Sequence, residues 1–423
     1  MARDGVPCRS ASDKRRPQVR HPPQKSRDDP GLRLDTLDFS LFLGGPLFQL
    51  LRRAHLADDA MMLVSQRVII IVLLAWVPLL VLSTLEGRVL GGNVAVPFLF
   101  DVEVHVRYLV ALPLLIIAEL VVHRRMRPLV QQFLERNLIP ESAMTRFDAA
   151  IASAFRLRNS VFAEALLIAI VYGVGILIIW RQYLALDTTT WYATPSAGDW
   201  KLSLAGMWYG YVSLPIFQFL LCRWYLRLFI WARFLWQVSR IDLSLVPTHP
   251  DRVGGLGFLA NTAYAFTVLA VAHGALLAGP LSNRIFFLGA AVSQYKVEIA
   301  VMVVFVLGMV FGPLLVFTGE LARAKRTGLR EYGTLAERYV REFDAKWLRG
   351  GAPSDGSFIG SADIQSLADI GISYEVVRTM RLAPITREAI LRVGAATLVP
   401  MVPLLLTMMP LDELAKMLFG VLF

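Results

Sequence analysis

The densest group of residues that could do chemistry is the stretch Thr-His-Pro-Asp-Arg-Val-Gly-Gly-Leu-Gly at positions 248–257. A carboxylate two residues from an imidazole can fix which ring nitrogen carries the proton. Glycines at the start of a helix expose backbone N–H groups, which attract phosphate or carboxylate groups beside a guanidinium. The sequence therefore predicts gating or anion binding at His249, Asp251, Arg252, Gly254, Gly255 and Gly257.

A structural interpretation of the same stretch stays open. Pro250 can end the preceding segment, Asp251 can cap the next helix, and the glycines allow close packing. The His-Pro-Asp tripeptide also occurs in J-domains, where it joins two soluble helices. Here an apolar segment follows directly, so we reject that analogy.

A second candidate is the stretch 223–240, in which arginines alternate with aromatic residues. At helical spacing Arg223 shares a face with Arg227, and Arg233 shares a face with Arg240. Aromatic rings suit the headgroup layer of a membrane, where guanidinium groups reach lipid phosphates. The four arginines are candidates for lipid-phosphate binding, although interfacial anchoring also explains them.

Ionisable residues are scarce inside the apolar segments. His273 alone is predicted to lie well inside one, where a hydrogen bond to a neighbouring helix explains it without a proton relay. Glu119 and Glu164 map to the ends of their segments. The sequence contains no HExxH, CxxC, phosphate-loop or nucleophile-elbow motif. We therefore predict no catalytic residues, no metal and no cofactor.

Seven apolar segments must position these candidates. A helix needs about 20 apolar residues to cross a hydrocarbon core of about 30 Å. Spans are predicted near 68–85, 108–122, 160–180, 202–222, 258–279, 299–318 and 393–411. The segment 108–122 is short and contains Glu119, but the charges flanking it make sense only if it crosses.

The basic residues give the predicted topology. Of the 43 Lys and Arg residues, 36 lie before the first span or in alternate connections, and seven lie in the others. Because basic residues near span ends stay in the cytoplasm, the N-terminus is predicted inside and the C-terminus outside. The predicted fold class is all-α, a polytopic bundle of seven transmembrane helices.

The basic residues near the span ends also explain the net charge of +10. Arginines there face anionic lipid, so the charge does not require a nucleic-acid partner.

Four regions are predicted. Residues 1–35 form a disordered, basic cytosolic tail, and 36–318 form the membrane domain. Residues 319–392 form a cytosolic helical region, in which the patterns of 320–348 and 361–381 predict two helices packed together as a small cap. Residues 393–423 contain the last span and a short outer tail.

The loop His-Pro-Asp-Arg-x-Gly-Gly-Leu-Gly-Phe at 249–258, together with segments 319–325 and 361–369, resembles an uncharacterised family of bacterial multi-pass inner-membrane proteins. The resemblance covers roughly residues 40–423. It implies a location in the bacterial inner membrane and no known activity.

Three functional hypotheses follow. The first is a channel or facilitator for a small solute, gated from the cytosolic side by the cap and the His249–Gly257 loop. The second is a membrane scaffold or sensor that recruits cytosolic partners. The third, an enzyme acting on lipid headgroups through His249 and Asp251, has the least support. Membrane lipid, a homo-oligomer and a cytosolic protein are the predicted partners.

Overall fold

Most of the described chain is helical, because long apolar segments can satisfy their backbone hydrogen bonds within one helix. The computed structural model describes residues 64–92, 94–180, 189–196, 199–350 and 362–406. The predicted tail 1–35 lies outside these ranges. Within them, the strands are confined to one antiparallel pair, β1 (Ala193–Ser196) and β2 (Asp199–Leu202).

Five helical segments are long and apolar enough to cross a membrane. They are Val64–Leu85, Val102–Glu135, Leu204–Ser239, Leu256–Phe287 and Val292–Leu348. A sixth span results if Glu141–Arg158 and Val161–Gly175, which meet at an angle of 47°, count as one. The described residues thus support five or six spans. The predicted seventh span continues beyond Leu406, outside the described residues.

The α-helices are joined into these longer segments by short 3-10 and π-helical turns. The α-helices are α3 (Val64–Leu85), α4 (Val102–His105), α5 (Leu112–Glu135), α6 (Met144–Arg158), α7 (Val161–Ile170), α9 (Leu204–Trp208), α10 (Leu214–Ser239), α11 (Thr262–Leu288), α12 (Lys296–Phe311), α13 (Thr318–Phe343), α14 (Ala362–Arg378), α15 (Arg387–Leu398) and α16 (Val402–Leu406). The turns are η1 (Phe98–Phe100), η2 (Val106–Ala111), η3 (Glu141–Ala143), η4 (Val171–Trp180), η5 (Tyr209–Ser213), η6 (Leu256–Asn261), η7 (Val292–Tyr295), η8 (Gly312–Phe317), η9 (Asp344–Leu348) and η10 (Val399–Met401).

Several helices extend past the predicted span boundaries. The short second span, 108–122, is part of a helical segment of 34 residues that begins at Val102 and ends at Glu135. The predicted span 202–222 likewise continues to Ser239. Hydropathy marks only the apolar part of a helix, whereas the backbone hydrogen bonds continue through the charged residues that follow it.

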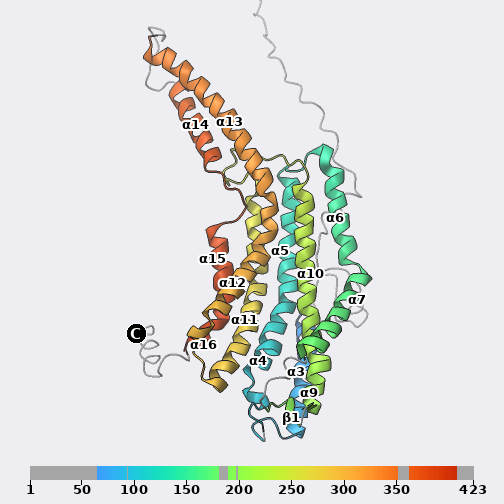
Figure 1. Cartoon of the computed structure of the whole chain (residues 1–423). Coiled ribbons are helices and arrows are strands. Elements are labelled where there is room, and N and C mark those ends of the chain that lie inside the picture. Colours follow the sequence, from blue (N-terminus) through green and yellow to red (C-terminus); the bar gives the residue numbers. More distant parts are fainter. Residues whose placement is uncertain (1–63, 93, 181–188, 197–198, 351–361, 407–423) are drawn as a thin grey trace, which may run out of the picture.

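The helix α11 lies at the centre of the bundle, packed against α5 and α15 (Figure 1). Its close approach to α15 depends on Gly274, where an added Cβ would lie 2.0 Å from the carbonyl oxygen of Thr397. The four-residue spacing of Gly308 and Gly312, at the end of α12, by itself predicts another close helix contact. The described residues do not form one, because nothing lies within 4 Å of a Cβ built at either glycine.

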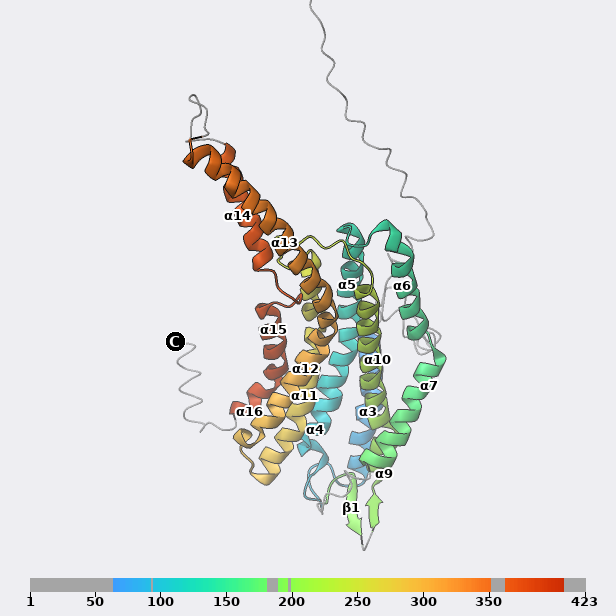
Figure 2. The same cartoon turned by 45° about the horizontal axis from the view of Figure 1, so that its top comes forward.

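The helices α13 and α14 pack together along an arm that extends away from the bundle (Figures 1 and 2). The Tyr339 hydroxyl donates to the carbonyl of Asp363 at 3.0 Å, which ties one helix to the start of the other. The pair projects from the bundle because α12, η8 and α13 form one continuous helical segment, Val292–Leu348.

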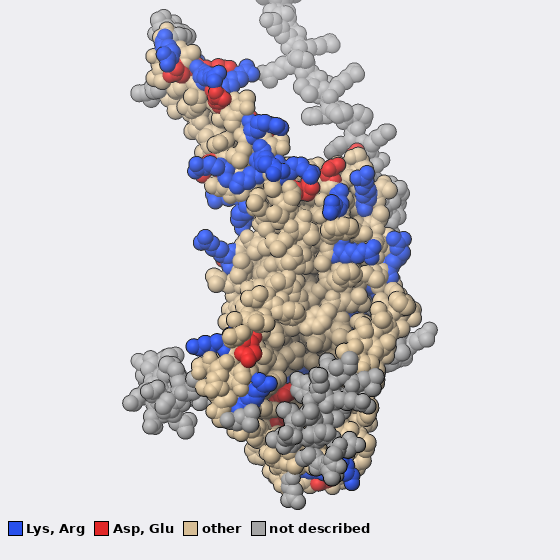
Figure 3. All heavy atoms as spheres, viewed as in Figure 1, with Lys and Arg blue, Asp and Glu red and all other residues tan. Residues whose placement is uncertain are grey.

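Charged side chains are distributed unevenly over the surface (Figure 3). Lys and Arg gather on the arm and on the end of the bundle from which it extends, with few at the opposite end. A surface almost free of charge lies between the two ends. We call the end that carries the arm the basic end.

Candidate functional site

The carboxylate of Asp251 organises the predicted 248–257 loop. It accepts hydrogen bonds from the backbone N–H groups of Val253 at 2.9 Å, Gly255 at 3.2 Å and Gly257 at 2.8 Å. Its Oδ1 also lies 2.9 Å from Nδ1 of His249. Two of the glycine amides that could bind an external anion therefore already donate to a side chain of the loop itself.

Asp251 is ionised at neutral pH. Partial burial alone would raise the pKa of this carboxyl, but the three backbone N–H donors and His249 together hold the pKa below its usual value. A group whose pKa is lowered by folding stabilises the folded state above its ordinary pKa, about 3.9 for Asp. This stabilisation is lost as the pH falls through the lower pKa of the folded state.

Asp251→Ala is therefore expected to lower the free energy of unfolding by about 2 kcal/mol at pH 7, since three N–H donors lose their acceptor. The difference from wild type should shrink below about pH 4, where the wild-type carboxyl also becomes protonated. Thermal unfolding in detergent over a pH series measures it. Asp369→Ala, at an exposed position of α14, is the control and should change little. A deficit that grows toward acid pH would contradict this assignment.

The same loop holds the base of the arm. Arg381, just after α14, donates its backbone N–H to the carbonyl of Arg252 at 2.7 Å and its Nη2 to the carbonyl of Asp251 at 3.1 Å. Lys325 of α13 donates to the carbonyl of Met380 at 2.8 Å. We call these Arg381 contacts the clasp, because they join the arm to the loop from which the α11 segment starts.

Close packing surrounds the clasp. Arg136, at the end of α5, donates to the carbonyl of Gly255 at 3.4 Å. A Cβ added at Gly328 of α13 would lie 2.7 Å from Pro247 and 3.0 Å from Val377 of α14. The loop and its flanking residue Pro247 are thus in contact with α5 and α13. They also contact the return segment of the arm, by which we mean the residues that follow α14, including Arg381.

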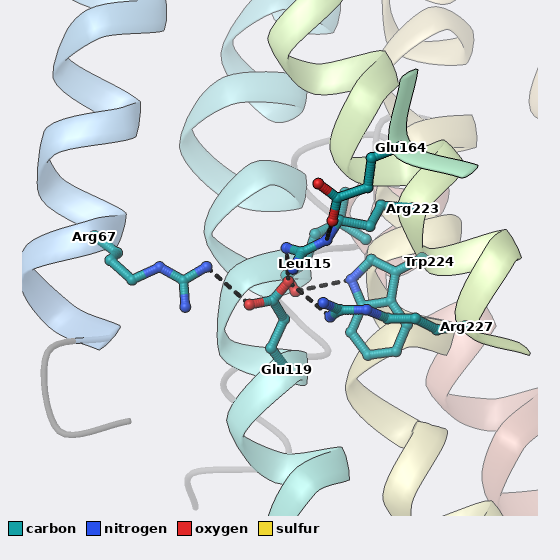
Figure 4. A network of polar contacts seen from close by, with 7 residues as sticks. All are labelled: Arg67, Leu115, Glu119, Glu164, Arg223, Trp224 and Arg227. Carbon is teal, nitrogen blue, oxygen red and sulfur yellow. Dashed lines mark hydrogen bonds and ion pairs between the residues drawn. The ribbon is translucent and has the colours of Figure 1, made fainter. Parts of the chain in front are cut away.

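A second site is a group of buried ionisable residues inside the spans (Figure 4). One oxygen of Glu119 accepts from Arg67 at 2.8 Å, and the other accepts from Arg223 at 3.1 Å and Arg227 at 3.0 Å. Glu164 lies 4.0 Å from Arg223. We call these five residues the Glu119 cluster. Glu119 and its three arginine partners are buried, and each of these side chains is at most 5% exposed.

Four helices bring this cluster together. Arg67 lies in the first turn of α3, Glu119 two turns into α5 and Glu164 in the first turn of α7. The two arginines of α10 are four residues apart and so share a face. Charges withdrawn from water are tolerated when they are paired and hydrogen-bonded. A carboxylate with three guanidinium partners meets this condition.

A third group of polar residues, some buried and some half-buried, lies at the end of the bundle away from the arm. Asp101 accepts hydrogen bonds from Nε1 of Trp191 and from Nδ2 of Asn283, each at 2.8 Å. Arg107 pairs with Glu103 and donates to the Tyr209 hydroxyl. We call this group the Asp101 cluster; it consists of Asp101, Glu103, Arg107, Trp191, Tyr209 and Asn283.

No family model, no curated protein and no solved structure matches the chain. Among the described residues, no group of three or more His, Cys, Asp or Glu side chains is placed to hold a metal ion.

The four arginines predicted to bind lipid phosphate divide into two pairs. Arg223 and Arg227 are buried and bonded to Glu119. Arg233 and Arg240 are exposed, and the guanidinium of Arg240 lies 5.4 Å from the centre of the Trp236 ring. Lipid-phosphate binding at the two exposed positions stays a prediction.

His273 joins two spans. Its Nε2 lies 3.1 Å from the hydroxyl of Tyr225 on α10, and its Nδ1 lies 2.8 Å from the carbonyl of Leu269 in its own helix. Both ring nitrogens thus have partners. This geometry agrees with the expectation of a hydrogen bond to a neighbouring helix.

Proposed function

We propose that the protein is a membrane channel or facilitator that provides a path for a small solute. The observation that carries the proposal is a pair of polar clusters on one helical segment, Val102–Glu135, with the Asp101 cluster at its start and the Glu119 cluster at its middle. Ionisable residues inside spans are costly, and they usually line solute or ion pathways.

One face of this segment connects the two clusters. Tyr108, Leu112, Leu115 and Glu119 recur at steps of three and four residues, as expected for one helix face. Each of them is buried, and the carbonyl of Leu115 accepts a hydrogen bond from Trp224 of α10 at 3.0 Å. The buried Tyr108 hydroxyl lies beside Arg107 of the Asp101 cluster. The proposed path follows this face, and the two leucines close it.

The arm is the proposed control element. Its helix α13 continues from the spanning helix α12, through the 3-10 turn η8 that contains Pro313. Its return segment is held by the clasp to the loop that starts the α11 segment. Since α11 packs against α5, a displacement of the arm can reach the proposed path.

The proposed orientation follows the charge distribution. In this proposal the basic end faces the cytosol, as basic residues near span ends do, and the membrane is the bacterial inner membrane. In this proposal the predicted span 393–411 supplies the seventh crossing. The arm would then be the cytosolic part that meets regulators.

Flux measurements in proteoliposomes test the function. Wild type is expected to conduct at least one member of a panel of small anions, cations and neutral solutes. Arg381→Gln is expected to raise this flux about fivefold, because removing a side-chain hydrogen bond of about 1 kcal/mol favours the released arm. Arg338→Gln, at an exposed arm position, is the control and should match wild type. No flux from either wild type or Arg381→Gln would contradict the proposal.

A scaffold or sensor is the second candidate, and the surface of the arm favours it. Leu335 and Val340 of α13 keep 49% and 50% of their surface exposed, and Ile372 of α14 keeps 63%. Exposed apolar side chains on a projecting helix pair suit a protein partner. This candidate predicts a specific protein that copurifies through the arm, in the absence of any flux.

A further inference from the structure

A groove beside the Glu119 cluster has a composition unlike that of the proposed solute path. It has a volume of about 410 Å³ and lies between α3, the α7–η4 segment and α10. Apolar side chains, including Ile71, Ile168, Ile216 and Leu220, form most of its lining, and Arg67 is its one charged residue. The volume falls in the range of ligand pockets, about 300–1,000 Å³.

The polar end of the groove has unused hydrogen-bonding capacity. Arg67 is 3% exposed, and its Nη2 donates to Glu119. Its Nε is buried without a hydrogen-bond partner in the described part of the chain. A buried donor left unsatisfied costs about 1–3 kcal/mol, so an acceptor at this position is strongly favoured. Among the described residues, the cluster also holds three guanidinium groups against two carboxylates, which favours an anion.

The groove runs from this charged end into the apolar part of the spans. Ile71 lies one turn after Arg67 on α3, and Ile216 lies one turn before Leu220 on α10, away from Arg223. These positions carry the groove away from the basic end. A ligand that fits it must have an anionic group at one end and an apolar chain at the other.

The groove is open toward the lipid-facing surface. Ile168 and Tyr172, which form part of its lining, each keep 48% of their surface exposed. These residues belong to the apolar segment α7–η4. An amphiphile can therefore enter sideways from a bilayer without crossing water.

We propose that the groove binds one anionic phospholipid, with its phosphate at Arg67 and one acyl chain between Ile71 and Ile216. In this proposal the lipid comes from the leaflet on the basic side, because the groove leads from Arg67 away from the basic end. This inference does not depend on solute flux, because a bound lipid can support the α3, α7 and α10 contacts whatever the protein transports.

Native mass spectrometry tests the proposal. The purified protein is incorporated into nanodiscs of equal parts phosphatidylglycerol and phosphatidylcholine, and released in mild detergent. We expect one retained phosphatidylglycerol per chain, in at least about tenfold excess over phosphatidylcholine, which corresponds to about 1.4 kcal/mol. Ile216→Trp should fill the groove and remove the retained lipid, while Arg67 and Glu119 stay paired. Arg67→Gln should remove the preference for the anionic lipid.

The matched control is Ile69→Trp on α3, where the side chain is 56% exposed and lies outside the groove lining. It adds the same bulk and should retain the lipid. Leu220→Trp serves as a second groove variant if Ile216→Trp does not fold. Equal retention of the two lipids would indicate surface lipid only. That result would overturn the proposal. So would a free fatty acid retained in place of the phospholipid, a wild-type protein without lipid, or a folded groove variant that retains the lipid fully.

Discussion

Glu119→Gln is expected to lower the free energy of unfolding by about 3–5 kcal/mol, the usual cost of removing one partner from a buried ion pair. Glutamine keeps the shape of the side chain but not its charge. Arg67, Arg223 and Arg227 would remain buried with Glu164 as the one carboxylate of the cluster. Thermal unfolding in detergent, followed by tryptophan fluorescence, measures the loss.

The control for this substitution is Glu337→Gln on the arm. Glu337 pairs with Arg341 four residues away, but both side chains are more than 60% exposed, so that the pair contributes about 0–1 kcal/mol. Adding Arg227→Gln to Glu119→Gln should restore part of the lost stability, because it removes one uncompensated charge. If Glu119→Gln unfolds at the same temperature as Glu337→Gln, the cluster does not stabilise the fold.

Gly274→Ala is expected to cost about 3 kcal/mol, at the upper end of the usual cost of overpacking a core. The new methyl group would lie 2.0 Å from the carbonyl oxygen of Thr397 and 3.2 Å from Pro400. Because the nearer atom belongs to the backbone, α11 and α15 would have to separate. The same unfolding measurement detects the loss.

Gly308→Ala is the matched control. It makes the same change in the middle of the spanning helix α12, where nothing lies within 4 Å of the added Cβ. Alanine is favoured over glycine inside a helix by about 0.5–1 kcal/mol, so this variant should be as stable as wild type or slightly more stable. Equal destabilisation of the two variants would contradict the close contact at Gly274.

The helical fold could be predicted from the sequence because the bilayer requires long apolar helices. The positions of helix ends could not be predicted as well, since hydropathy does not report hydrogen bonds beyond the apolar residues. The close α11–α15 contact has a local signal, the four-residue spacing of Ala270, Gly274 and Ala278. The same rule predicted a contact at Gly308, so that the spacing alone does not identify the partner helix.

The two candidate sites also differ in how far the sequence could predict them. Hydrogen bonding by Asp251 is local, because its backbone partners lie within six residues. The sequence pointed to Asp251 as the cap, but the N-cap position of η6 is Gly255. The Glu119 cluster depends on tertiary packing, with partners 52 to 108 residues away. The available signal was the carboxylate in an apolar segment, which requires a buried cation but does not specify which one.

The most direct test of the proposed path is the accessibility of Leu115, which lies between the two polar clusters. Leu115→Cys is introduced after Cys8 and Cys222 are replaced by serine, and a membrane-impermeant thiol reagent is applied. We predict reaction that becomes faster when Arg381→Gln weakens the clasp by removing its side-chain hydrogen bond. Ile69→Cys, at an exposed position of α3, should stay unreactive. Leu115→Cys that reacts no faster than Ile69→Cys in either background would contradict a solute path along α5.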